Sequence, residues 1–111
     1  ARADEMIVTG GFNVAPADVE QVLVQHPSVL ECACVASPDD TGNRIHVVKA
    51  FIVLKKDYKP YQGLIGELQD YFKENGPPFM YPRKIEFVTS LPKGITGKLL
   101  RSELRRRELE E

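Results

Sequence analysis

Residues 45–54 read Ile-His-Val-Val-Lys-Ala-Phe-Ile-Val-Leu and predict the strongest strand of the chain. β-branched and aromatic side chains, which pack well on a pleated surface, are concentrated in this stretch. Upstream, Val29–Ala36 is rich in Val, Ala and Cys and predicts another strand. Turn-forming residues at 37–43 separate the two segments. The middle of the chain is therefore predicted to build a sheet.

Shorter elements flank this sheet. Residues 6–8 and 12–14 predict two short strands around a Gly-Gly turn, and Pro16 predicts the start of a helix that His26-Pro27 ends. Further along, the apolar spacing predicts a helix over 63–75, a strand over 83–88 and a final helix over about 99–109. This order predicts an α+β fold, in which about three helices pack on a small, mainly antiparallel sheet.

The composition limits the classes of function. A length of 111 residues is enough for one domain with a modest core. No apolar run approaches the ~20 residues of a membrane span, and a net charge of −1 gives no general attraction to nucleic acid. Cys32 and Cys34 are interpreted as small buried apolar side chains rather than a redox pair. His26 and His46 lack a ligand pattern, so no metal site is assigned.

The segment Pro92-Lys93-Gly94-Ile95-Thr96-Gly97-Lys98 is the most informative motif of the chain. A loop with two glycines holds a lysine just before a predicted helix. Because the helix dipole disfavours a cation at that end, Lys98 is expected to serve an anionic group rather than local stability. Taken alone, such a lysine is better explained as a solvated surface residue.

Together with Arg2-Ala3-Asp4-Glu5 and Thr9-Gly10-Gly11, this motif resembles the carboxy-terminal domain of the acyl-adenylate-forming enzymes. The spacing Pro-Lys-x-x-Thr-Gly-Lys-x-x-Arg, from Pro92 to Arg101, is specific within that family. The segments 81–88 and 91–93 look like those of medium-chain and aromatic acyl-CoA synthetases, and the Gly10-Gly11-Phe12-Asn13 loop is similar to that of some benzoate-type ligases. The resemblance covers nearly the whole chain.

The resemblance implies an AMP-forming acid–CoA ligase that works in two steps. A carboxylate and ATP first give an acyl-adenylate and pyrophosphate, and CoA then displaces AMP to give the thioester. Residues 1–111 would be the small, mobile domain, inactive alone, while ATP and its Mg²⁺ would bind mainly to a large amino-terminal domain that this chain lacks. Lys98 would be the catalytic lysine of the adenylation step. Asp4, accompanied by Arg2, would be the hinge.

The resemblance also implies a CoA-binding surface. The Thr9-Gly10-Gly11 loop would line the channel for the pantetheine arm, because glycine lets a ligand approach the backbone closely. Arg44, Lys73 and Phe79 would contact the CoA nucleotide. Each of these three alone is explained about as well by a surface charge or, for Phe79, by a core aromatic. Phe12 stands where many relatives have an arginine.

Two other functions stay open. An adenylation domain that loads a carrier protein would share Lys98 and the hinge, whereas Arg44 and Lys73 favour CoA. A non-catalytic α+β binding module would dock a protein or nucleic acid through the arginines of the final helix, but interleaved glutamates favour a solvated, salt-bridged helix. We expect a cytoplasmic protein, or one of the mitochondrial matrix in a eukaryote. The pocket that selects the carboxylic acid is expected in the large domain.

Overall fold

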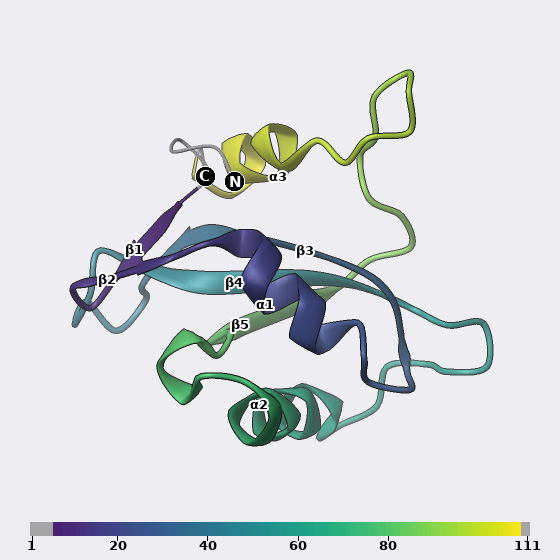
Figure 1. Cartoon of the computed structure of the whole chain (residues 1–111), viewed down its shortest axis with the longest axis horizontal. Coiled ribbons are helices and arrows are strands. Elements are labelled where there is room, and N and C mark those ends of the chain that lie inside the picture. Colours follow the sequence, from purple (N-terminus) through teal and green to yellow (C-terminus); the bar gives the residue numbers. More distant parts are fainter. Residues whose placement is uncertain (1–5, 110–111) are drawn as a thin grey trace.

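The fold is organised around a three-stranded sheet with β4 at its centre (Figure 1). The computed structural model describes residues 6–109, so the expected hinge residues Arg2 and Asp4 lie outside the described residues. β3 (Val29–Pro38) pairs antiparallel with β4 (His46–Leu54), and these are the two strands that the sequence predicts most clearly. β5 (Lys84–Phe87) lies on the other side of β4 and runs parallel to it.

A two-stranded sheet precedes the larger one. β1 (Ile7–Thr9) and β2 (Phe12–Val14) pair antiparallel around the Gly10-Gly11 turn, as predicted. Both glycines have positive φ, +57° and +84°, a conformation that side chains disfavour. The α+β prediction is confirmed, and β4–β5 is the one parallel pair among the described strands.

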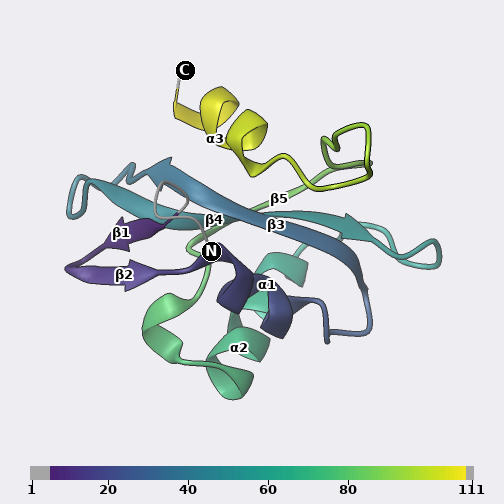
Figure 2. The same cartoon turned by 45° about the horizontal axis from the view of Figure 1, so that its top comes forward.

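The helices cover both faces of the three-stranded sheet (Figure 2). α1 (Pro16–Leu23) and α2 (Leu64–Asn75) lie on one face, and α3 (Arg101–Leu109) lies on the other. A short 3₁₀ turn, η2 (Pro78–Met80), lies between α2 and β5. The sequence predicts the helices themselves, but it does not place α3 on a face of its own.

The side chains of β3 explain this arrangement. Residues 32–36 are all buried, because successive side chains point to opposite faces and helices cover both. Cys32 and Cys34 belong to the core under α1 and α2, whereas Ala33 and Val35 pack with Leu104 of α3. The two thiols are thus buried, as predicted, with their Sγ atoms 3.9 Å apart. Burial raises the pKa of the Cys34 thiol.

Two helix ends differ from the prediction. α1 ends at Leu23, and the chain continues in turns, since the His26 N–H donates to the Leu23 carbonyl. α3 begins at Arg101 rather than near Leu99, because a hairpin that pairs Lys93 with Leu99 comes first. None of the described helices is long and apolar enough to cross a membrane.

Candidate catalytic lysine and nucleotide-binding surface

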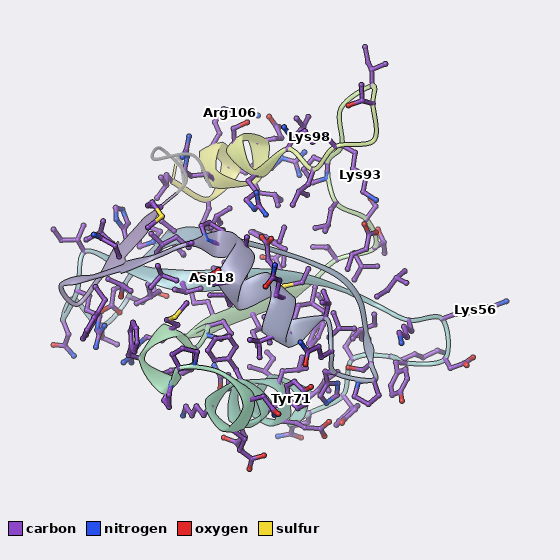
Figure 3. The ribbon with its side chains drawn as sticks, viewed as in Figure 1. Asp18, Lys56, Tyr71, Lys93, Lys98 and Arg106 are labelled. Carbon is purple, nitrogen blue, oxygen red and sulfur yellow. The ribbon has the colours of Figure 1, made fainter. Side chains whose placement is uncertain are left out.

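Lys98 lies on the returning leg of the hairpin that precedes α3. Its backbone carbonyl accepts a hydrogen bond from the Gly94 N–H (2.8 Å), and the Leu100 N–H donates to the Pro92 carbonyl (2.9 Å). Gly97 turns the chain at φ +82°, which favours glycine there. The Lys98 side chain is exposed, near the start of α3 (Figure 3). The hairpin therefore presents a flexible ammonium on a hydrogen-bonded mount.

The structure removes one argument for Lys98. α3 begins three residues after it, so Lys98 lies outside the helix and the cation at the helix start is Arg101. The expected conflict between Lys98 and the helix dipole is wrong for that reason, because the effect falls off within the first turn of the helix. What remains in favour of Lys98 is its geometry, namely an exposed cation held on a hairpin.

A second surface forms where the β1–β2 turn meets the loop before β4. Arg44 Nη1 donates a hydrogen bond to Thr9 Oγ1 (3.2 Å), and a Cβ added at Gly10 would lie 2.7 Å from Arg44 Cζ. The backbone of Arg44 is held by Asp39, whose Oδ2 accepts from the Arg44 N–H (2.9 Å). Hydrogen bonds from Thr41, and then from the Arg44 backbone, hold the pKa of Asp39 below its usual range. The predicted residues Thr9, Gly10 and Arg44 thus meet.

Aromatic rings extend this surface. Phe12 faces Thr9 across the hairpin, and its ring centroid lies 4.5 Å from that of Phe79, with the two planes tilted by 35°. Each of the two phenylalanines is 48% exposed. Phe79 is therefore a surface aromatic, and the core interpretation of this residue is wrong.

Lys73 and two residues that the sequence analysis did not select complete the surface. Lys73 Nζ lies 4.2 Å from the ring centroid of Tyr81, and Arg83 Cζ lies 5.0 Å from the same centroid. The Tyr81 ring therefore makes cation–π contacts with both Lys73 and Arg83. Tyr81 and Arg83 share with Arg44 an open pocket of about 460 Å³, which acidic side chains also line.

The two surfaces lie apart. The β1–β2 turn lies on the left and the loop before α3 lies on the right in Figures 1 and 2. Five of the six predicted CoA residues belong to the surface around Arg44: Thr9, Gly10, Arg44, Lys73 and Phe79. Gly11 lies at the same turn and faces open space. Within residues 6–109, no three His, Cys, Asp or Glu side chains form a cluster that could hold a metal ion.

Comparison with known proteins identifies the family of this chain. Residues 18–98 match the AMP-binding enzyme C-terminal domain family. The chain belongs to this family. The matched residues of this AMP-binding C-terminal domain include Arg44, Lys73, Phe79 and Lys98. The Thr9–Gly11 turn lies before the matched segment.

Similar proteins to this AMP-binding C-terminal domain are CoA ligases. Human mitochondrial acyl-coenzyme A synthetase ACSM3 is 49% identical over 110 residues, which cover 97% of this chain and 18% of the relative. A crystal structure of Brucella canis acyl-CoA synthetase superimposes with a TM-score of 0.90 and 40% identity, covering 99% of this chain and 20% of that one. The crystal structure of the anthranilate CoA ligase AuaEII in complex with anthranoyl-AMP superimposes with a TM-score of 0.88 and 44% sequence identity. The match covers 97% of this chain and 20% of that one.

The chain thus spans about a fifth of the length of the relatives it matches. The resemblance to the carboxy-terminal domain of acyl-CoA synthetases is confirmed. Membership of the AMP-binding C-terminal domain family also argues against an unrelated binding module. The arginines of α3 support the same conclusion, since Glu103 accepts from Arg106 (2.7 Å) and Arg107 (3.2 Å) as a salt-bridged helix requires.

Proposed function

We propose that this chain is the C-terminal domain of an ATP-dependent, AMP-forming acid–CoA ligase. The whole enzyme would convert a carboxylate, ATP and CoA into acyl-CoA, AMP and pyrophosphate through an acyl-adenylate. The proposal rests on the family together with one observation, the separation of the Lys98 hairpin from the Arg44 surface. Two separate surfaces on one domain suit two consecutive half-reactions.

In the first half-reaction, Lys98 would act electrostatically. A carboxylate oxygen attacks the α-phosphate of ATP, pyrophosphate leaves, and negative charge builds up on the phosphate oxygens between them. An ammonium held beside those oxygens stabilises that charge more than it stabilises the bound substrates, which lowers the barrier. The exposed side chain and the hydrogen-bonded hairpin support this assignment, because the ammonium can reach a site on another domain.

In the second half-reaction, the residues of the Arg44 surface fit CoA. The cations of Arg44, Lys73 and Arg83 suit its phosphates, and the half-exposed rings of Phe12 and Phe79 suit stacking with its adenine. The Arg44 guanidinium packs against Gly10, and beside it the side-chain-free backbone of Gly11 faces open space, which leaves room for a thin pantetheine arm at this turn. These residues would bind and orient CoA so that its thiol reaches the acyl-adenylate.

The rest of the proposal concerns the parts outside this chain. ATP with Mg²⁺ and the carboxylic acid would bind mainly to the large amino-terminal domain, so this chain would be inactive alone. Asp4, with Arg2, would be the hinge about which the small domain turns between the half-reactions. The human relative is named as mitochondrial, which makes the mitochondrial matrix a candidate location beside the cytoplasm.

The test uses the enzyme that carries this domain together with its large domain. Lys98→Ala should lower ATP–pyrophosphate exchange by about 10²–10³-fold, the usual loss for one such contact. Thioester formation from supplied acyl-adenylate and CoA should be retained. Lys56→Ala, which removes an exposed lysine after β4, is the matched control and should change neither (Figure 3). Unchanged exchange in Lys98→Ala would remove Lys98 from the reaction.

A further inference from the structure

Arg101, the first residue of α3, forms a two-point ion pair with Glu20 of α1. Arg101 Nε donates to Glu20 Oε2 (2.8 Å), and Arg101 Nη2 donates to Glu20 Oε1. The side chains are largely buried, with 23% of Arg101 and 11% of Glu20 exposed. A guanidinium fork that bonds both carboxylate oxygens fixes direction as well as distance. This contact therefore holds the start of α3 in one place.

The ion pair spans the edge of the sheet. β3 is an edge strand, and the Cys34 N–H points outward and donates to Glu20 Oε2 (2.8 Å). α1 and α3 lie on opposite faces of the sheet, so the Glu20–Arg101 pair joins the two helices around this edge. The hydrogen bond from the β3 backbone holds the Glu20 carboxylate in place, and the carboxylate in turn holds the Arg101 guanidinium.

A second ion pair holds the other leg of the Lys98 hairpin. Lys93 Nζ lies 2.6 Å from Glu31 Oε1, and Glu31 is a residue of β3. This pair is more exposed, with 42% of Lys93 and 35% of Glu31 open to solvent, so it contributes less than the buried pair. Lys93 enters the hairpin and Arg101 follows its exit. Glu31 belongs to β3 and Glu20 is hydrogen-bonded to β3, so both ends of the hairpin are held at this strand, with Lys98 between them.

The dipole of α3 explains why Arg101 needs a carboxylate partner such as Glu20. A cation at the first residue of a helix is unfavourable, yet Arg101 occupies that position. The Glu20 carboxylate compensates this cost, and it does so only while α3 starts where the fork can form. A shift of the helix start would break both hydrogen bonds and leave a largely buried carboxylate without its cation.

We propose that Glu20 and Arg101 are positioning residues for Lys98 in the adenylation half-reaction, with Lys93 and Glu31 as a weaker second anchor. The inference rests on the proposed function of Lys98. The two ion pairs fix where the hairpin leaves the domain, and so they fix where the ammonium arrives on the large domain. Loosening either one spreads Lys98 over several positions, and a misplacement of about 1 Å costs on the order of 10²-fold in rate.

The experiment measures both half-reactions in the enzyme that carries this domain and its large domain. The variants are Arg101→Gln, Glu20→Gln and, as the matched control, Arg107→Gln, which breaks an exposed pair on the same helix. We expect pyrophosphate exchange to fall about 10- to 100-fold in the first two. Thioester formation from supplied acyl-adenylate should stay within about twofold of wild type, because that step does not use Lys98. The control should match wild type in both.

The decisive comparison repeats Arg101→Gln in a Lys98→Ala background. If Arg101 acts through Lys98, it should cause no further loss of exchange there, since coupled residues are not additive. A merely structural role predicts the same loss in both backgrounds, or an equal loss of both half-reactions, and either result overturns the proposal. Normal pyrophosphate exchange in Arg101→Gln, in an enzyme whose exchange Lys98→Ala abolishes, would also overturn the proposal. If Lys98→Ala itself leaves exchange intact, the proposed function of Lys98 fails instead.

A conservative variant covers the case in which Arg101→Gln does not fold. Arg101→Lys keeps the charge and the partner but loses the fork. It should fold, retain thioester formation and still lower exchange, by less than the glutamine variant would. Wild-type exchange in Arg101→Lys, together with wild-type exchange in the separate variant Lys93→Met, would overturn the proposal.

Discussion

The ring of Phe12 packs against the ring of Phe79 at a centroid distance of 4.5 Å. The first ring comes from the β1–β2 hairpin and the second from η2, so this contact joins two segments that are 67 positions apart in numbering, from 12 to 79. Each residue keeps about half of its surface open to solvent. A pair of rings this exposed offers a face on which a planar ligand can stack.

Phe12→Ala should raise the KM for CoA by about fivefold or more, because stacking of a base on an aromatic side chain contributes ~1–3 kcal/mol. Pyrophosphate exchange should not change, since that half-reaction does not use CoA. Steady-state kinetics with CoA as the varied substrate checks this. Tyr58→Ala, which removes an exposed ring from the connection after β4, is the control. An unchanged KM for CoA in Phe12→Ala would contradict the stacking assignment.

Gly10→Ala and Gly11→Ala form a matched pair. Both positions have positive φ, so both variants should lose ~1–2 kcal/mol of unfolding free energy through backbone strain. Only at Gly10 would the added methyl group collide with the Arg44 guanidinium, because Gly11 faces open space. Gly10→Ala should therefore also raise the KM for CoA, which kinetics and urea unfolding measure together. Equal KM values in the two variants would show that the contact with Arg44 does not matter for CoA.

The double variant Arg44→Gln/Lys73→Gln should weaken the use of CoA and spare pyrophosphate exchange. Loss of charged hydrogen bonds to phosphate, ~1.5–3 kcal/mol each, should raise the KM for CoA at least about tenfold. Lys55→Gln/Lys56→Gln removes the same charge from an exposed connection and serves as control. A parallel fall in exchange would show that the two surfaces are not functionally separate. Failure of the wild-type enzyme to use CoA at all would favour a carrier protein as acceptor.

Glu108 should make stability depend on pH. Burial acts to raise its pKa, but hydrogen bonds from Ser37 Oγ (2.6 Å) and Lys49 Nζ (2.9 Å) outweigh it and lower the pKa of Glu108. A carboxyl whose pKa is lowered on folding stabilises the fold above its unfolded pKa, and this contribution is lost as the pH falls through the folded value. Glu108→Gln should therefore cost ~1–2 kcal/mol at pH 7 and progressively less below pH ~4.

Urea unfolding of the chain at several pH values measures this difference. The control is Glu103→Gln, on the same helix, whose partners Arg106 and Arg107 are exposed and should matter less. A cost for Glu108→Gln that is the same at acid and neutral pH would contradict the ionic explanation.

Local patterns were sufficient for much of this fold. The concentration of β-branched and aromatic side chains over residues 45–54, the Gly-Gly turn and Pro16 each act within a few residues, and the structure has the strands and helices in the predicted order. The face that α3 covers was not predictable. Only Leu104 of this helix is buried, so its apolar pattern is too weak to show where it packs.

Long-range contacts explain what the sequence analysis missed at the site. Glu20 lies on the buried face of α1 with Val19 and Leu23. An acid on a buried face needs a partner, and here the partner lies 81 residues away at Arg101. No spacing rule joins residues so far apart. Tyr81 and Arg83 escaped for a similar reason, since their relation to Arg44 exists only once the sheet has formed.

The carboxylate of Glu20 also changes what the sheet offers to other chains. An edge strand normally presents backbone groups that a strand from another molecule can pair with. In the middle of β3 the outward Cys34 N–H is already bonded to Glu20, and the Arg101 side chain lies against the same carboxylate. A strand approaching this edge would have to displace a largely buried ion pair before it could form its ladder. This edge of the sheet should therefore resist intermolecular sheet growth.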